Sequence, residues 1–270
     1  MAYTLDDLLY LMSRLRDKEK GCPWDIEQDF SSIAPSTLEE CYELVDAITV
    51  GEPQQIREEL GDLLFQVVFY AQLGKEQQWF TFADVVDTIA SKLVRRHPHV
   101  FPDGTLRSVP GTGIDVEKVK RQWEAIKEEE RGKKQQHGVL DDIPKALPAL
   151  CRAQKIQKRL SRVGFDWPDA ATTFRKLKEE LAELEEAIAS GNAAGQAEEM
   201  GDLLFSCVNV ARHLGIDTET ALADANRKCS ARFNRVEELL RENGRSPEES
   251  SLEEMDILWE QAKRELRSRG

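Results

Sequence analysis

The sequence predicts an all-α protein built from two tandem copies of one helical-bundle domain. Apolar residues recur with helical periodicity along most of the 270 residues, and no segment shows the convincing alternation of a β-strand. One stretch is also repeated: nine of the fourteen residues at 58–71 are identical to those at 198–211. A repeat at a fixed offset indicates two copies of one structural unit. We therefore expect helical domains at 1–135 and 136–270.

The apolar periodicity places five helices in each half of the chain. The first five are expected at 4–18, 37–49, 54–74, 81–97 and 115–131, and the second five at 144–161, 170–190, 193–214, 218–243 and 252–267. Gly51 and Pro53 mark a turn between the second and third helices of the first half, and Gly191 and Gly195 mark the same place in the second. Helices joined by a short turn run antiparallel, so each half is expected to contain a helical hairpin.

Capping residues and composition set the limits of several elements. Expected N-caps of the last two helices are Asp217 or Thr218 and Ser251, and Gly215 and Gly244 are expected to end the helices before them. The stretch 128–138 is charged, contains two glycines and has no apolar side chain. We interpret it as the linker between the domains.

Four carboxylates return in both copies at the same spacing. They are Glu180, Glu183, Glu199 and Asp202 in the second half, and Glu40, Glu43, Glu59 and Asp62 in the first. Each helix of the hairpin carries two of them, three residues apart and therefore on one face. Four converging carboxylates repel one another unless a cation lies between them, and oxygen ligands favour Mg²⁺, or Mn²⁺, over zinc. The pattern predicts a metal site in the second half and a weaker one in the first.

A solvated helix face is the alternative explanation for these acids, since 32% of all residues are charged. The repeat favours the metal site over it. All four acids recur, whereas neighbouring positions change, as from Gln66 to Ser206. Surface charges that served only solubility would be expected to drift with their neighbours.

Two basic residues and a tryptophan also recur, at a slightly different offset. Lys92, Arg96 and Trp123 of the first half return as Lys228, Arg232 and Trp259. A Lys/Arg pair on one helical face can bind phosphate oxygens, and a tryptophan can stack on a nucleobase. A salt bridge between helices is the alternative for the basic pair, and plain core packing is the alternative for the tryptophan.

Several short motifs occur in a characteristic order along the whole chain. They are Gly21-Cys-Pro-Trp-Asp25, Glu59-Leu-Gly-Asp-Leu-Leu-Phe65, Arg95-Arg-His-Pro-His-Val-Phe101, Leu140-Asp-Asp-Ile-Pro144 and Val163-Gly-Phe-Asp-Trp167. With them the chain resembles the MazG family of nucleoside triphosphate pyrophosphohydrolases in its two-domain bacterial form. The resemblance implies tandem MazG-like all-α domains, usually a homodimer, and hydrolysis of nucleoside triphosphates to monophosphate and pyrophosphate with Mg²⁺.

The expected roles follow from the site and this resemblance together. The four acids of the second half hold Mg²⁺, and water activated by the metal attacks the α-phosphate. Glu179 and Glu180 are the expected catalytic residues, with Glu179 as the group that orients or deprotonates the water. The substrate is expected to contact Lys176, Glu179, Glu198, Lys228, Arg232 and Trp259.

The two halves are not expected to be equivalent. Lys176 and Lys178 of the second half correspond to Ser36 and Leu38 of the first, which therefore lacks a cation beside its acids. The first half also carries a loop at 98–113 without a counterpart in the second. We expect the second half to be catalytic and the first to be weak, selective or structural, and the resemblance implies the same.

Composition limits the partners and the location. A formal net charge of −13 argues against nucleic acid as a partner, because that would require a basic face. The five cysteines form no Cys-x-x-Cys pair, and Cys41 and Cys207 are expected to be buried and reduced. We expect no signal peptide, no membrane segment and a cytoplasmic location. The apolar stretch 63–69 requires cover on several sides, which predicts a homodimer.

Two other functions remain open at this point. One is a helical nucleotide-sensing or regulatory dimer that binds Mg-nucleotide without turnover. The other is a narrower pyrophosphatase that acts on particular dNTPs, in place of broad base specificity. Release of pyrophosphate from a panel of nucleotides would distinguish them.

Overall fold

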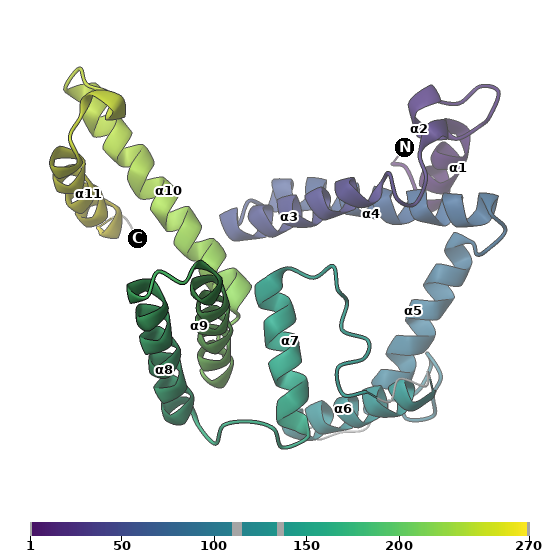
Figure 1. Cartoon of the computed structure of the whole chain (residues 1–270). Helices are drawn as coiled ribbons and strands as arrows, with labels where there is room; N and C mark the ends of the chain where they lie inside the picture. The colour runs from purple at the N-terminus through teal and green to yellow at the C-terminus, as the bar shows by residue number, and fades with distance from the viewer. Residues whose placement is uncertain (1, 110–114, 134–137, 269–270) are drawn as a thin grey trace. The chain divides into compact units, whose positions relative to one another are not determined.

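The computed structural model describes residues 2–109, 115–133 and 138–268, and its ribbon is drawn in Figure 1. Within these residues every regular element is a helix, which confirms the predicted all-α class. The chain divides into two compact units, Met1–Glu130 and Arg131–Gly270. In the described ranges we find no helix with the length and apolar character needed to cross a bilayer.

The first unit is built around a hairpin of two long helices. Its elements are α1 (Leu5–Leu15), α2 (Pro23–Glu27), α3 (Ala34–Val50), α4 (Pro53–Glu76), α5 (Phe82–Arg96) and α6 (Val116–Lys133). The hairpin turns at Gly51, whose φ of +82° is a left-handed conformation that glycine adopts without a Cβ clash. α1 packs on α4, and Met12, Val68 and Phe69 are fully buried between them.

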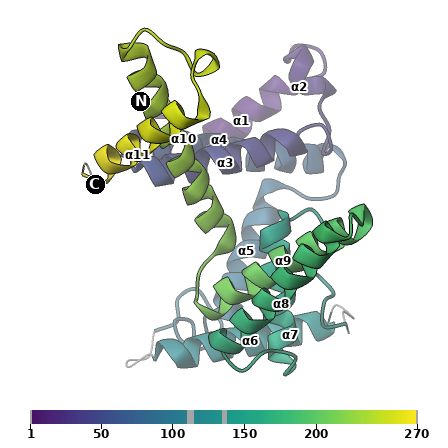
Figure 2. The same ribbon diagram turned by 60° about the vertical axis from the view of Figure 1, so that its left-hand side comes forward.

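The second unit repeats the hairpin and adds a second one. Its elements are α7 (Ala149–Arg162), α8 (Ala170–Ala189), α9 (Ala193–His213), α10 (Thr218–Glu242), the 3₁₀ turn Pro247–Glu249 and α11 (Leu252–Arg267). α8 and α9 lie side by side, and α7 packs against α9 (Figures 1 and 2). α10 leads away from this group, and α11 packs back along it around Val236, Leu240 and Ala262.

The predicted helices are all present, with ends that differ by a few residues. Asp217 and Ser251 cap α10 and α11, because their side chains accept hydrogen bonds from the backbone N–H of Thr220 and Glu254. The sequence missed α2, which is five residues long and too short to show periodicity. It also missed the 3₁₀ turn.

The boundary between the two units, after Glu130, falls within the predicted linker at 128–138, but part of that stretch is helical. α6 continues through Lys133, so the first six residues of that stretch are helical. The reason is that Glu, Arg and Lys are good helix formers, so a charged stretch without apolar residues still continues a helix. Residues 134–137 of the predicted linker lie outside the described residues.

The expected burial of two cysteines is also wrong for the single chain. Cys41 of α3 and Cys207 of α9 are exposed, although both stand in apolar stretches. Each lies on a hairpin whose two helices cover one face of each other and leave other faces open. The five cysteines, all of which lie in the described ranges, are free thiols.

Candidate functional site

The α8–α9 hairpin brings together three of the four predicted acids of the second unit. Carboxylate oxygens of Glu180, Glu199 and Asp202 all lie within 4.8 Å of one another. Glu180 comes from α8, and the other two come from α9, which runs alongside it. Glu180 is only 7% exposed, whereas Asp202 faces solvent. The group is therefore open on one side and walled by protein on the other.

Electrostatics links the fourth acid to this group. Partial desolvation raises the pKa of Glu199, and the nearby carboxylates of Glu183 and Asp202 raise it further. Glu183 lies outside the 4.8 Å group but is close enough to disfavour the charge on Glu199. A cluster of oxygen donors that repel one another fits a hard divalent cation such as Mg²⁺.

A lysine of α8 is directed at the same carboxylates. The Nζ of Lys176 lies 2.9 Å from Oε1 of Glu180 and 3.3 Å from Oε2 of Glu179. Hydrogen bonding to Glu180 is the largest cause that raises the pKa of Lys176, and it keeps the side chain charged. Glu179 and Glu198 are exposed beside the cluster. The site thus offers a positive charge next to the acids, as a polyphosphate ligand requires.

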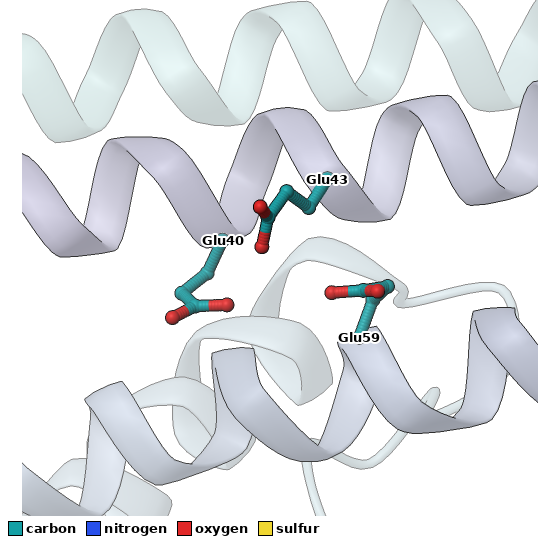
Figure 3. Close-up of side chains that lie close together, drawn as sticks. All are labelled: Glu40, Glu43 and Glu59. Atoms are coloured by element: carbon teal, nitrogen blue, oxygen red, sulfur yellow. The ribbon is translucent and has the colours of Figure 1, made fainter.

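The first unit has an equivalent acidic cluster on α3 and α4. Oxygens of Glu40, Glu43 and Glu59 lie within 4.8 Å of one another, and Figure 3 shows the three side chains converging from facing helices. Desolvation raises the pKa of Glu40, followed by the charges of Asp62 and Glu43. In the described part of the chain no ion pair reaches these acids, in contrast to the second unit.

The predicted basic pair and tryptophan of the second unit form a separate group on α10 and α11. The guanidinium of Arg232 lies 5.7 Å from the ring centroid of Trp259, and the ring packs on the core of that hairpin. Lys228 lies exposed one turn earlier. Among the described residues no hydrogen bond or ion pair joins Lys228 or Arg232 to the acids of α8 and α9. The structure therefore places the predicted acids and the predicted basic pair in two separate groups.

In the first unit the counterpart of Arg232 is bound to a carboxylate. Glu130 of α6 accepts hydrogen bonds from Arg96, at 2.5 Å, and from Arg95, at 2.6 Å. The hydrogen bond from Arg96 is the largest cause that lowers the pKa of Glu130, which falls to about 2. At the repeat offset of 136, Glu130 corresponds to Leu266. A salt bridge between helices, the alternative weighed for the basic pair, is what the first unit shows for Arg96.

Lys92 and Trp123 are the other first-unit counterparts. Lys92 lies half-buried one turn before Arg96 on α5. The ring of Trp123 lies 5.5 Å from that of His97, which ends α5 and contacts the Leu93 carbonyl oxygen. These contacts tie α5 to α6, so the described geometry around Trp123 is that of helix packing.

Sequence reasoning missed a cavity of about 320 Å³ beside the acids of the second unit. α7, the segment 163–167, α8 and α9 line it, and Lys176 and Glu180 form part of its wall. The motif Val163-Gly-Phe-Asp-Trp167 was the signal for it, because this segment supplies two of the aromatic walls, Phe165 and Trp167. Asp166 anchors the segment to α9 through Arg212 and His213, and the hydrogen bond from Arg212 lowers its pKa against the effect of burial.

Comparison with known proteins agrees with the duplicated geometry. The model of the MazG nucleotide pyrophosphohydrolase domain matches twice, at residues 28–101 and 169–237. A nucleoside triphosphate pyrophosphohydrolase of Escherichia coli K12 is 50% identical over 263 residues, which cover 97% of each chain. A nucleoside triphosphate pyrophosphohydrolase/pyrophosphatase MazG of Thermotoga maritima is 44% identical over 258 residues, covering 96% of this chain and 95% of the relative. The chain belongs to the MazG family.

Proposed function

We propose that this chain hydrolyses nucleoside triphosphates, ribo- and deoxyribo- alike, to nucleoside monophosphates and pyrophosphate with Mg²⁺. The observation that carries the proposal is the convergence of Glu180, Glu199 and Asp202 beside the Lys176 ammonium. The names of the relatives from E. coli and T. maritima support the same reaction.

The acids divide into those that would hold the cation and those that would act on water. Glu180, Glu183, Glu199 and Asp202 would hold one or two Mg²⁺ ions, and Mn²⁺ suits the same oxygen donors. When bound, Mg²⁺ supplies positive charge to the triphosphate oxygens and makes a water molecule more acidic. Glu179, exposed beside the cluster, would orient that water or remove its proton.

The chemistry is an in-line substitution at the α-phosphorus. The water oxygen forms a bond to the α-phosphorus, and the bond to the bridging oxygen breaks so that pyrophosphate leaves. Lys176 would offset charge on the phosphates from within the α8–α9 hairpin. Lys228 and Arg232 would do so from α10, while Glu198 and Trp259 contact the substrate around them. Positioning and charge stabilisation suffice for this reaction without a covalent nucleophile.

We further propose that the enzyme is a cytoplasmic homodimer in which these groups meet. Apolar side chains at matching repeat positions are exposed in both hairpins, which supports the same contact for both. The pairs are Ile48 and Ile188, at 57% and 59%, Leu60 and Met200, at 51% and 45%, and Leu64 and Leu204, at 41% and 51%. Faces of this kind are stabilised by burial against a second copy, with two-fold symmetry as the simplest arrangement.

Pyrophosphate release from a panel of NTPs and dNTPs, with and without Mg²⁺, tests the proposal. We expect release from several bases, only with the cation. Binding of nucleotides without release would instead indicate a sensor, and release from one dNTP alone would indicate a narrow pyrophosphatase. Either result would contradict the proposed broad hydrolase.

A further inference from the structure

We propose that a cavity of the first unit, between α5 and the loop 98–106, binds a nucleoside monophosphate that has an amino group on its base. The proposed hydrolysis releases molecules of this kind, so the inference rests on the proposed function. The cavity has a volume of about 530 Å³ and shares no residue with either acidic cluster. It is therefore a site separate from the proposed catalytic residues.

The loop on one side of this cavity is held in place by its own hydrogen bonds. The backbone N–H groups of Val100 and Phe101 donate to the carbonyl oxygen of His97, at 2.9 Å and 2.8 Å. Asp103 accepts from the backbone N–H and the hydroxyl of Thr105, at 2.9 Å each. The side chains that the loop adds to the lining are Pro98, Phe101, Pro102 and Leu106. An aromatic ring among prolines offers a flat apolar surface on which a base can stack.

The helix α5 supplies a polar stripe along the other wall. Asp87, Ser91 and Arg95 line the cavity at intervals of four residues, so they lie on one face of the helix. The eight residues from Asp87 to Arg95 separate the two charges by about 12 Å along the helix axis. A ligand that matches them has an anionic group at one end and an N–H donor at the other. A nucleoside monophosphate with an amino base has this arrangement.

Arg95 has the charge and the donors to bind the phosphate. It shares Glu130 with Arg96, so one carboxylate faces two guanidinium groups and one positive charge remains. The side chain of Arg95 is 53% exposed, whereas that of Arg96 is 17% exposed. The bonds from Arg95 to Glu130 use Nε and Nη2, and within the described residues no hydrogen bond engages Nη1. A guanidinium group with a free donor edge binds phosphate oxygens strongly.

Asp87 suits the amino group of a cytosine or an adenine. In the part of the chain that the structure describes, no hydrogen bond or ion pair engages its exposed carboxylate. An ionised carboxylate only accepts hydrogen bonds. Cytosine and adenine present an amino group on the base edge, where uracil presents a carbonyl oxygen. The cavity should therefore prefer CMP to UMP.

The second unit lacks these features at the equivalent positions. At the repeat offset of 136, Asp87 corresponds to Ala223 and Arg95 to Ala231. Where the first unit leaves the helix at Pro98, α10 continues as a helix through Glu242. The loop and both charges therefore occur together in the first unit. This distinguishes the cavity from the phosphate-binding role proposed for the basic pair of α10.

Isothermal titration calorimetry of the full-length protein with CMP tests the proposal. Full-length Glu180→Gln with Glu183→Gln, in the presence of a chelator, serves as the background, so that no cation at the proposed catalytic site contributes to binding. In this background Arg95→Met should weaken CMP binding about tenfold, because a charge-assisted contact is lost. Ser91→Phe fills the cavity but keeps both charges and the Glu130 ion pair, and it should weaken binding at least as much. Asp87→Asn should remove the preference for CMP over UMP.

Arg107→Met is the matched control, because Arg107 is exposed directly after the loop and does not line the cavity. CMP should bind this variant as it binds the background. Equal losses in Arg107→Met and Arg95→Met, or CMP binding that Arg95→Met and Ser91→Phe leave unchanged, would overturn the inference. Inorganic phosphate or UMP bound as tightly as CMP would overturn it as well, because the site would then not recognise an amino base.

The outcome for this cavity is separable from that for the reaction. CMP binding that depends on Arg95 and Ser91 supports the site even if the wild type releases no pyrophosphate. Pyrophosphate release by the wild type, together with no CMP binding to the background, retains the hydrolase and removes the site.

Discussion

The ammonium of Lys176 lies 2.9 Å from a carboxylate oxygen of Glu180, one turn further along α8. Among the described residues, Lys176 is the only cation paired with the acids of either hairpin, and it belongs to the second unit. Lys176→Met should raise KM for a triphosphate by about tenfold, because a charge-assisted contact to phosphate is lost. Binding of Mg²⁺ alone should not weaken, since the carboxylates lose a competing cation.

Lys178→Met is the control for this variant. Lys178 is exposed on the same helix, with its Nζ 5.3 Å from the centroid of the Phe174 ring. Steady-state kinetics and calorimetry with Mg²⁺ check both variants. An unchanged KM in Lys176→Met, or an equal change in Lys178→Met, would show that Lys176 does not bind the substrate.

Glu180→Gln and Asp202→Asn should abolish turnover and leave the helical fold intact. Each removes a charged oxygen ligand from the 4.8 Å group. The remaining acids then repel one another less, so thermal stability without metal should hold or rise. Pyrophosphate release and circular dichroism melts measure the two effects, and activity retained by both variants would remove the metal-site hypothesis.

A matched pair of double variants tests the division between the units. Glu180→Gln with Glu183→Gln should silence the enzyme, whereas Glu40→Gln with Glu43→Gln should leave most of the activity. The reason is that Ser36 stands where the second unit has Lys176, and that Glu130 neutralises Arg96. The reverse outcome in the pyrophosphate assay would show that the first unit is the catalytic one.

Mg²⁺ should stabilise the protein more at neutral than at acidic pH. Partial desolvation and neighbouring carboxylates raise the pKa of Glu199, so this group is destabilising where it is ionised and that cost is relieved as pH falls. Protons therefore compete with the cation for the same oxygens. Thermal melts with Mg²⁺ and with a chelator should differ at pH 7 and converge on acidification. A difference that does not depend on pH would point to a cation bound elsewhere.

Glu130→Gln should lower stability near neutral pH and change its dependence on acid. The pKa of Glu130 is lowered from 4.5 to about 2 by Arg96 and Arg95. A lowered pKa means that the stabilisation is present above 4.5 and is lost as pH falls toward 2. The difference in melting temperature between wild type and variant should shrink over that window. A constant difference would mean that the ion pair does not contribute.

The helices and the acidic clusters were predictable because both rest on local spacing. Glu180 and Glu183 share a helical face wherever the helix lies, and the short turn at Gly191 makes α8 and α9 antiparallel. The repeat then distinguishes these acids from the other charged residues of the chain. Local spacing in the sequence is therefore enough to predict the hairpin and the carboxylates that it carries.

The ion pair of Arg96 and the cavity beside Gln157 depend on contacts between distant segments. Glu130 lies 34 residues from Arg96, and the repeat pattern paired Arg96 with Lys92 instead. In the sequence Gln157 is an ordinary polar residue of α7. Only in the folded unit does α9 place the Phe205 carbonyl oxygen where the Gln157 side chain donates a hydrogen bond to it. Sequence periodicity does not predict such long-range contacts, because they depend on how the helices pack. The burial predicted for Cys41 failed for the same reason, since apolar neighbours do not reveal which faces a partner covers.

The ion pair between Arg96 and Glu130 gives the basic residue of one repeat a structural role. Because Arg96 joins α5 to α6 through Glu130, substitution at this position should lower the stability of the first unit. Arg232 instead lies over the ring of Trp259, and under the proposed function its substitution should weaken binding of the substrate phosphates. An arginine at the same position of the repeat is thus constrained by different requirements in the two units. The effect of a substitution should therefore be considered separately for each copy. A neutral residue at 96 should change the stability of the first unit, and a neutral residue at 232 should change the binding of the proposed substrate.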